Sequence, residues 1–338
     1  MTGVQTCALP ICEYIRSLVV PSACPDILRG MGDDCAVIGK GSGLVQLLSL
    51  DTMVEGVHFD RSFHPPDLLG RKLVSVNVSD IAAMGGRPTM LLLSSGLPPG
   101  FDEAWVLAFN RGLHAACRDY GCTLVGGDTV ASPGGFCFSL TILGEMAAGE
   151  VLYRSGAQQG DTLYVSGNLG FAAAGLALLQ ADRAGCAPDF APLVDRHLNP
   201  EARVALGQQL AASGLVHAMM DSSDGPASDV AQLCSASGLG ARIFADRLPA
   251  SNILTEAARL FDANPQDWML KGGEDFELLF TAAPEHDTAL RAIARKCGLR
   301  LTPIGCMDAG AGLRLVAGDG RDSPLDYQGY EHFCEPGL

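Results

Sequence analysis

The sequence has little positive charge and no long apolar run. Its 338 residues include 23 lysines and arginines against 38 aspartates and glutamates, which gives a formal net charge of −15. Because binding along a nucleic-acid backbone needs a basic surface, this balance argues against a nucleic-acid partner. No apolar stretch reaches about 18 residues, so we expect no membrane span. A signal-peptide pattern is also missing, and we therefore expect a cytoplasmic protein.

The common nucleotide-binding motifs are missing as well. The sequence contains no GxxxxGK[ST], and no GxGxxG follows an expected strand, which excludes a P-loop enzyme and a dinucleotide-binding fold of the usual kind. Only four lysines are present, none in a VAIK motif of the protein-kinase type. The segment Gly167–Gly170 (GNLG) remains open, either as a phosphate-binding loop or as a tight strand-to-helix turn.

The cysteine pattern does not predict disulfides. Twelve cysteines are present, but no two form a CxxC pair. They are scattered through apolar segments, such as Cys137 in GGFCFSL. Reduced, buried thiols are therefore the better interpretation for a cytosolic chain.

The length predicts two domains. The first twelve residues, MTGVQTCALPIC, show neither periodicity nor a helix cap and resemble a translated sequencing adapter, so we treat residues 1–12 as a non-native extension. A change of composition near 146–149 marks the domain boundary. We expect an N-terminal domain at 13–146 and a C-terminal α/β domain at 150–335.

Hydrophobic periodicity predicts alternating strands and helices in the first half. We expect a helix at 67–84, with Asp67 as its N-cap, and a second helix at about 102–119. Strands are expected at 44–51, 89–95, 122–126 and 138–145. This order indicates an α/β layer with helices on one face. The second half predicts strands at 161–167, 240–245, 275–282 and 300–305, with helices at 170–181, 200–213, 285–297 and after Pro226.

Acidic residues recur beside glycines at the ends of the expected strands. Any one of them could be an ordinary turn former or helix cap. Together they offer what Mg²⁺ prefers, carboxylate oxygens from several loops, with glycines that allow a phosphate to come close. Bound cations would then replace the missing lysines as partners for phosphate. The set comprises Asp33, Asp34, Asp51, Asp80, Asp128, Asp221 and Asp224.

Seven segments in a fixed order carry a family resemblance: GMGDDCAVI, SLDTMVEGVHF, VNVSDIAAMGG, VGGDTV, RSG with GDTLYVSG, DSSDG and KGGEDFELLF. The sequence resembles the thiamine-monophosphate kinase family, within the superfamily that includes aminoimidazole ribonucleotide synthetase. The resemblance runs from Glu13 to Phe333. It implies ATP-dependent phosphorylation of thiamine monophosphate to thiamine diphosphate. It also implies a two-domain α/β (α+β) fold, and a homodimer whose N-terminal sheets join into a barrel.

The same resemblance implies roles for individual residues. The proposed ligands of several Mg²⁺ ions are Asp34, Ser49, Leu50 (by its backbone), Asp51, Asp80, Asp128, Asp221 and Asp224. Among these, the catalytic group is Asp51, Asp80, Asp128 and Asp221. ATP would contact Gly127, Asp128, Arg154 and Ser223, and thiamine monophosphate would contact His58, Glu274 and Tyr330.

Three residues depart from the family pattern, and one of them is Ser222, which replaces an apolar residue before Ser223 and Asp224. Leu50 stands where the family often has threonine, and Asn110 stands where a tyrosine often packs on the nucleotide. Two alternatives stay open at this point. One is another enzyme of the superfamily, although Cys12 and Cys24 lack the lysine and glycine-rich neighbourhood of a selenophosphate synthetase. The other is a non-catalytic protein that binds Mg²⁺ and nucleotide.

Overall fold

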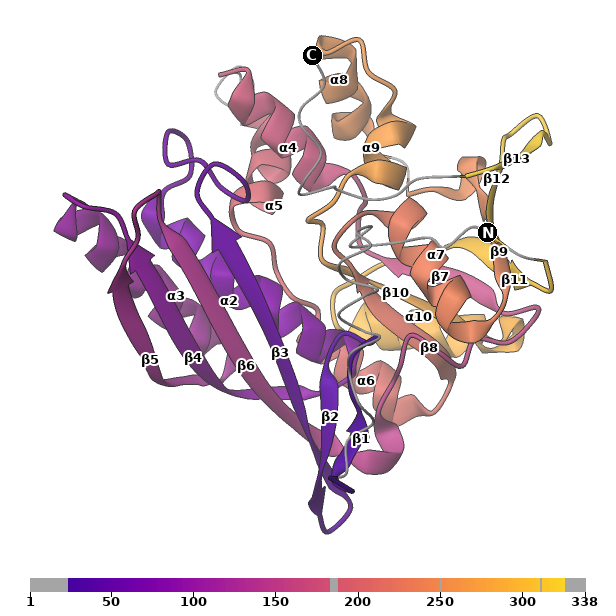
Figure 1. The fold of residues 1–338 in the computed structure, drawn as a ribbon. Coiled ribbons are helices and arrows are strands. Elements are labelled where there is room, and N and C mark those ends of the chain that lie inside the picture. The colour runs from indigo at the N-terminus through magenta and orange to yellow at the C-terminus, as the bar shows by residue number, and fades with distance from the viewer. Residues whose placement is uncertain (1–23, 183–187, 250, 311, 326–338) are drawn as a thin grey trace. The chain divides into compact units, whose positions relative to one another are not determined.

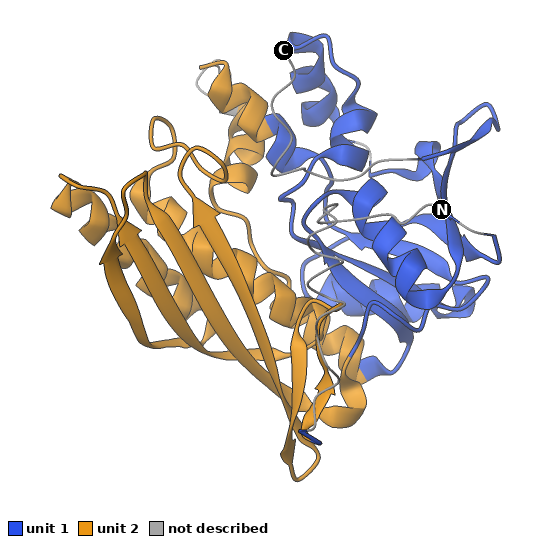
Figure 2. Cartoon of the chain, viewed as in Figure 1, with its two compact units in different colours: residues 1–25, 152–174, 213–338 blue, residues 26–151, 175–212 orange. Residues whose placement is uncertain are grey.

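The computed structural model describes residues 24–182, 188–249, 251–310 and 312–325 (Figure 1). The chain divides into two compact units, coloured separately in Figure 2. Unit 2 comprises residues 26–151 and 175–212, and unit 1 includes 152–174 and the residues from 213 onward. Each unit is a mixed α/β structure built on one sheet, as the sequence predicts. The domain limits at 146 and 150 stay a prediction.

Unit 2 is built on a six-stranded sheet with the order β1-β2-β3-β6-β4-β5. Neighbouring strands are antiparallel except for β4 and β5, which are parallel. Among the residues described, neither this sheet nor that of unit 1 closes into a barrel. The strands are β1 (Ile27–Arg29), β2 (Ala36–Gly41), β3 (Leu44–Val54), β4 (Arg87–Leu97), β5 (Thr123–Ala131) and β6 (Cys137–Ala147).

Two helices, α2 (Pro66–Ala83) and α3 (Glu103–Tyr120), pack together against one face of this sheet (Figure 1). Glycines allow their close approach. A Cβ atom on Gly70 would lie 2.1 Å from the carbonyl oxygen of Phe109, and one on Gly112 would lie 1.8 Å from that of Asp67. The predicted N-cap at Asp67 is wrong: the cap position is Pro65, and Asp67 lies in the first turn because a proline at N1 starts the helix one residue earlier.

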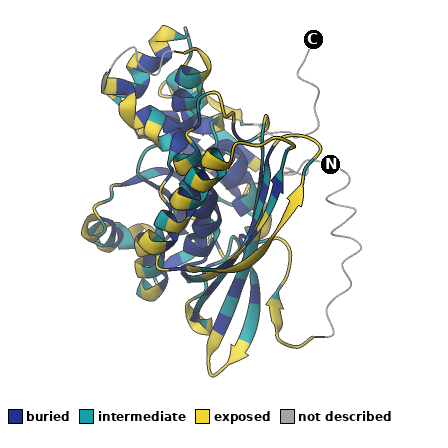
Figure 3. Cartoon of the chain, turned by 90° about the vertical axis from the view of Figure 1, so that its left-hand side faces the viewer, coloured by how far each residue is buried: buried dark blue, intermediate teal, exposed yellow. Residues whose placement is uncertain are grey.

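Burial alternates along β4 and β6 with the two-residue period of a strand (Figure 3). The face toward α2 and α3 carries Leu91, Leu93, Leu140 and Ile142, all of them buried. We call this the helix face of the sheet, and the opposite one the outer face. The helix face therefore forms the core of unit 2.

All four strands predicted in unit 2 are longer than expected, and β3 and β5 pass their expected C-terminal ends by the most residues. The ladder between β3 and β6 runs without interruption from the pair Leu44–Ala147 to the pair Val54–Cys137, and so passes the expected end at 51. Strand β5 continues through Gly126 and Gly127 to Ala131, because β4 pairs with it along that whole length. Glycine marks a β-bulge here rather than a strand end: Leu91 faces Leu124, whereas Leu92 faces Gly126.

Unit 1 is built on a seven-stranded sheet with the order β13-β12-β9-β11-β7-β10-β8. Only β12 and β9 are parallel among its neighbouring pairs. The central strands are buried on both faces, so they read as continuous apolar runs in the sequence. The strands are β7 (Thr162–Ser166), β8 (Val216–Ser222), β9 (Gly240–Phe244), β10 (Glu277–Ala282), β11 (Leu301–Asp308), β12 (Gly312–Val316) and β13 (Asp322–Pro324).

The remaining helices are short. The sequence predicts four of them, α4, α6, α7 and α10, and it predicts only a loop with short helical pieces at 181–195, where α5 begins. It misses α8 and α9, which have nine and seven residues. In the described part of the chain, no helix is both long and apolar enough to cross a membrane. The helices are α4 (Phe171–Gln180), α5 (Ala191–Leu198), α6 (Val204–Ser213), α7 (Pro226–Ser237), α8 (Asn252–Leu260), α9 (Pro265–Lys271) and α10 (Asp287–Lys296).

Candidate active site

Strand β3 places Ser49 and Asp51 on the helix face of the sheet. Side chains alternate along a strand, so these two residues continue the row of Val45 and Leu47, which are fully buried. Leu50 points to the outer face, and its side chain is 58% exposed. A ligand contribution from position 50 on the helix face is therefore restricted to the backbone, as proposed.

Helix α2 brings two polar side chains to this row. The hydroxyl of Ser49 donates to a carboxylate oxygen of Asp80 over 2.5 Å. The side-chain oxygen of Asn77 accepts from the backbone N–H of Asp51 over 3.1 Å, while its amide group donates to the carbonyl of Leu73. Asn77 is completely buried and was not among the predicted site residues. Its position three residues before Asp80, on the same side of the helix, is the signal that could have found it.

Asp34 completes an acidic group within unit 2. It is buried just before β2, and its carboxylate comes within 4.8 Å of that of Asp80. Burial, and secondly the negative charge of Asp34, raise the pKa of Asp51 to about 6. Carboxylates crowded in this way repel one another, and a divalent cation between them would remove that repulsion. The donor set of Asp34, Ser49, Asp51 and Asp80 consists only of oxygen atoms, which suits Mg²⁺.

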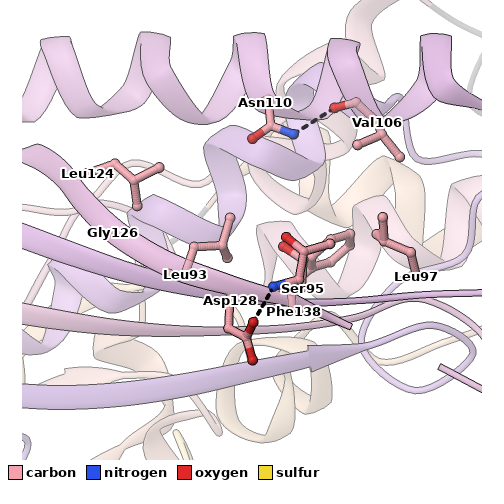
Figure 4. Close-up of a pocket in the computed structure, with 11 residues that line it drawn as sticks. Leu93, Ser95, Leu97, Val106, Asn110, Leu124, Gly126, Asp128 and Phe138 are labelled. Carbon is pink, nitrogen blue, oxygen red and sulfur yellow. Dashed lines mark hydrogen bonds between the residues drawn. The ribbon is translucent and has the colours of Figure 1, made fainter. Parts of the chain in front are cut away.

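Asp128 does not join this group within the chain. It pairs with Ser94 across the sheet, and Ser94 pairs with Ser139, whose hydroxyl lies 2.7 Å from that of Thr52. These four residues form a polar row on the outer face, between apolar residues. Figure 4 shows the carboxylate of Asp128 turned away from α3. The structure thus separates Asp128 from Asp51 by the thickness of the sheet.

A pocket of about 270 Å³ lies between α3 and the strands β4 and β5 (Figure 4). Its walls are mostly apolar and include Leu93, Val106 and Phe138. Gly127 lines the same pocket, but the need for glycine there comes from the sheet: a Cβ atom would lie 1.9 Å from the carbonyl oxygen of Leu93. The departure at Asn110 also falls in this pocket.

The loop after β3 fixes the ring of His58. The backbone N–H of Val54 donates to Nδ1 of His58 over 3.0 Å. In the neutral ring the proton must then be on Nε2, which becomes a hydrogen-bond donor. Glu55 ties this loop down by accepting from the backbone N–H of Phe136 and from Arg61. His58 is therefore held as an oriented donor.

Unit 1 contributes the acids at the end of β8. Asp221 is buried in the strand, while Ser223 and Asp224 follow it in a half-buried turn. Asp229, in the first turn of α7, accepts from the hydroxyl of Ser222 over 2.8 Å and from the backbone N–H of Asp224 over 3.4 Å. Burial, followed by the charge of Asp224, raises the pKa of Asp229. Asp229 was not predicted as a site residue, and it holds the turn that presents Asp224.

The segment of Glu274 lies beside this turn. The backbone N–H of Glu274 donates to the carbonyl of Ser223 over 2.8 Å, and that of Phe276 donates to the carbonyl of Ser222 over 3.0 Å. Glu274 has a φ of 69°, a left-handed backbone conformation that residues other than glycine rarely adopt. The backbone strain at this residue is the energetic cost of holding its half-buried side chain in this position. Arg154 donates to the side-chain oxygen of Gln232 in α7 over 2.5 Å.

The glycine-rich segment 167–170 is a tight strand-to-helix turn. The carboxylate of Asp275, almost completely buried, accepts from the backbone N–H groups of Gly170 and Ala172 over 2.5 and 2.9 Å. This carboxylate occupies the N-terminus of α4, where a phosphate would otherwise bind. The phosphate-loop alternative is therefore wrong. Asp275 lies more than a hundred residues away in the sequence, so the local motif gave no sign of it.

Several predictions concern residues outside the described ranges. Tyr330 and residues 1–12 lie there, so their roles stay predictions. The described cysteines are free thiols, as expected; Cys35, Cys117, Cys122 and Cys234 are buried, whereas Cys24 is exposed.

Comparison with known proteins decides the family. Residues 32–146 match the model of the AIR synthase related protein N-terminal domain, and residues 158–318 match that of the C-terminal domain. The thiamine-monophosphate kinase of Salmonella typhimurium is 40% identical over 313 residues, which cover 92% of this chain and 94% of that protein. The enzyme of Bacillus subtilis is 33% identical, over 90% and 93% of the two chains.

The chain belongs to the thiamine-monophosphate kinase family. Solved structures of this family agree with the fold. AaThiL complexed with AMPPCP and TMP superposes with a TM-score of 0.81 at 34% identity, covering 96% of this chain and 94% of that one. The thiamine-monophosphate kinase from Stenotrophomonas maltophilia K279a has a TM-score of 0.76 at 37% identity, covering 92% and 95%. Hydrogenase maturation proteins at 16–20% identity share the fold alone.

Proposed function

We propose that the chain transfers a phosphoryl group from ATP to thiamine monophosphate, giving thiamine diphosphate and ADP. The observation that carries this proposal is the group formed by Asp34, Ser49, Asp51 and Asp80 in unit 2. In a chain of the thiamine-monophosphate kinase family, that all-oxygen group fits the Mg²⁺ ions that phosphoryl transfer requires.

The reaction brings two anions together. The phosphate of the acceptor, with a second pKa of about 6, is largely dianionic near neutral pH and needs little help from a general base. The main obstacle is its repulsion from the triphosphate. Asp34, Ser49, Asp51 and Asp80 would hold Mg²⁺, which would supply positive charge to offset the negative charge of the phosphates. With no need for a covalent nucleophile in the chain, we propose direct, in-line transfer.

The chain's own residues prepare the groups that would hold the cations. Asn77 holds the backbone of Asp51, and Ser49 holds the carboxylate of Asp80, so both residues are positioned before any ligand binds. Asp229 does the same for the turn of Asp224. Asp221 and Asp224 stay proposed metal ligands, and Arg154 and Ser223 stay proposed ATP contacts, on the strength of the family resemblance.

The acceptor would contact His58, Glu274 and Tyr330. The orientation of the first two residues supports this proposal. His58 presents an Nε2–H donor suited to a phosphate or a ring nitrogen. The carboxylate of Glu274 can balance a cationic thiazolium ring. Tyr330 would stack on one of the rings, a contact worth about 0.5–2 kcal/mol.

We also propose a homodimer formed through the outer face of the unit 2 sheet. This face exposes large apolar side chains on three strands, and exposed apolar patches often mark protein–protein interfaces. Strand β5 is an edge strand of nine residues and is exposed along most of its length, which invites pairing with another chain. The exposed side chains are Leu50, Met90, Leu92, Val125 and Val130. Asp128 lies on the same face, so a second copy would bring it into the dimer interface.

An acceptor panel tests the proposed function. The protein is incubated with ATP, Mg²⁺ and either thiamine monophosphate or free thiamine, and ADP and thiamine diphosphate are quantified by chromatography. We expect equal amounts of ADP and thiamine diphosphate from the monophosphate, and no product from thiamine. Tight ATP binding without ADP release would instead identify a non-catalytic nucleotide-binding protein.

A further inference from the structure

The segment 272–276 lies between the turn after β8 and the N-terminus of α4, within unit 1. On the side of the turn, the backbone N–H groups of Glu274 and Phe276 donate to backbone carbonyls at the end of β8 over 2.8 and 3.0 Å. A Cβ atom on Gly273 would lie 2.5 Å from the carbonyl oxygen of Ser223, so the two main chains are in direct contact. The backbone of the segment is therefore fixed against the turn.

The side chain of Asp275 fixes the other side of the segment. This residue is 1% exposed, and its two carboxylate oxygens accept separately from the backbone N–H groups of Gly170 and Ala172. Both bonds are charge-assisted, and the dipole of α4 strengthens them. A buried carboxylate that moved away would lose both bonds where water does not replace them, which is costly. The side chain of Asp275 therefore has one strongly preferred orientation.

The residues on either side of Asp275 both have a left-handed backbone. The φ of Glu274 is 69°, and that of Phe276 is 50°. Residues other than glycine pay for this conformation in energy and keep it only where their surroundings hold them in it. The bonds of Asp275 to α4 act between the two strained residues, so they oppose relaxation on both sides. Because the φ of Glu274 sets the direction of its side chain, Asp275 helps to set that direction too.

We propose that Asp275 is a positioning residue for the acceptor, which acts by holding the carboxylate of Glu274 in its binding direction. The inference rests on the proposed function, because it takes Glu274 as a contact of thiamine monophosphate. Both carboxylate oxygens of Asp275 bind the backbone of α4, so Asp275 acts on the acceptor only through Glu274. Once the bonds to α4 are lost, Glu274 relaxes toward an ordinary φ and its carboxylate leaves the acceptor.

A double-mutant cycle on Glu274 and Asp275 tests this coupling. Asp275→Asn keeps the shape of the side chain but turns an amide N–H₂ toward a backbone N–H. Asparagine caps helices as well as aspartate does, so the fold should survive, and a thermal melt checks it. We expect the KM for thiamine monophosphate to rise roughly tenfold and the KM for ATP to change less than about twofold. In Glu274→Ala, which already lacks the carboxylate, adding Asp275→Asn should change the KM for thiamine monophosphate less than about twofold.

Ser251→Ala is the control for the loss of a helix cap. Ser251 caps α8 in the same unit by accepting from the backbone N–H of Leu254. This variant should lower the Tm and leave both KM values unchanged. If Asp275→Asn does not fold, Asp275→Ser gives the same comparison, since a serine hydroxyl can also cap a helix.

A purely structural role for Asp275 predicts the same rise in KM with and without the carboxylate of Glu274, and that result would overturn the inference. An unchanged KM for thiamine monophosphate in the Asp275 variant would also overturn it. If Glu274→Ala alone keeps the wild-type KM for thiamine monophosphate, the inference fails while the proposed reaction stands. If the wild type forms no thiamine diphosphate, the inference falls together with the proposed function.

Discussion

Asp51 is a residue whose negative charge is unfavourable in the folded protein without a cation beside it. Its pKa is about 6 in the folded protein against an ordinary 3.8, so the folded state binds more protons than the unfolded state between these values. The free energy of unfolding therefore falls as pH rises through this window. A shift of this size corresponds to about 3 kcal/mol by pH 7. Stability and catalysis make opposite demands on this side chain.

Asp51→Asn should therefore inactivate the enzyme and stabilise the metal-free protein. Without Mg²⁺ at pH 8, we expect its Tm to exceed that of the wild type, with the difference vanishing near pH 4, where Asp51 is protonated. Turnover should fall on the order of 10³-fold, since the variant loses a ligand that positions the phosphates. Thermal melts across pH, with and without Mg²⁺, measure the first effect. A variant that melts below the wild type at pH 8 would contradict it.

Glu274 combines a strained backbone with a proposed substrate contact, and two substitutions separate these properties. Both Glu274→Ala and Glu274→Gly remove the carboxylate, so both should raise KM for thiamine monophosphate by a similar factor. Only glycine relieves the φ of 69°. The free energy of unfolding of Glu274→Gly should thus exceed that of Glu274→Ala by about 1 kcal/mol, and its Tm should be higher. The reverse order of the two melting temperatures would show that the backbone is not strained.

The sequence predicts the orientation of a proposed site residue only where its strand is regular. The two-residue period of a strand already puts Ser49 and Asp51 on one face and Leu50 on the other. The face of Asp128 could not be predicted, because the bulge between Leu124 and Gly126 shifts the register by one residue. A shift of one residue moves the side chain to the opposite side of the sheet.

At the scale of elements, most of the strands and long helices follow from periodicity, but their ends depend on distant partners. Strand β5 continues through two glycines because β4 supplies hydrogen bonds along it. The N-terminus of α4 is capped by Asp275, which no local motif reveals. Short elements such as α9 carry too few turns for a periodic signal.

The glycine pair of β5 provides a test at this scale. A Cβ on Gly127 would lie 1.9 Å from a backbone oxygen of β4, whereas one on Gly126 would meet only the end of the Leu92 side chain, at 3.3 Å. Gly127→Ala should therefore destabilise the protein by about 1–3 kcal/mol or more, because the strands must separate. Gly126→Ala should be tolerated. Chemical denaturation measures both, and equal losses of stability would contradict the account of the bulge.

At the scale of the whole molecule, the two compact units are not consecutive segments of the chain. Residues 175–212 belong to unit 2, although the chain has already formed β7 of unit 1 before reaching them. Composition predicts a break near 146–149 but gives no sign of this return, because the return depends on which core the later helices pack against. Helix α6 is an example: Gly207 approaches the backbone of Ala82 in α2 so closely that a Cβ would lie 2.2 Å from its carbonyl oxygen.

The proposed dimer can be tested by charge placed on the outer face. Leu92 is 43% exposed on this face, and Leu92→Asp should convert a dimer into a folded monomer, because a buried charge without a partner strongly opposes association. Leu107→Asp is the control, since Leu107 is 60% exposed on α3, away from that face. Sedimentation velocity measures the mass of each. A wild type that sediments as a monomer, or a Leu92→Asp variant that remains a dimer, would contradict this interface.

The central claim is that acidic side chains hold the cations that allow one phosphate to attack another. It is tested most directly by single-turnover formation of thiamine diphosphate from ATP and thiamine monophosphate, with Mg²⁺ titrated, for the wild type, Asp80→Asn and Asp67→Asn. Asp67 is an exposed carboxylate on the same helix as Asp80, so its variant controls for charge and helix stability. We predict product from the wild type and Asp67→Asn, none with a chelator, and a loss on the order of 10³-fold in Asp80→Asn. Near-wild-type transfer by Asp80→Asn at saturating Mg²⁺, or transfer that survives the chelator, would contradict the account.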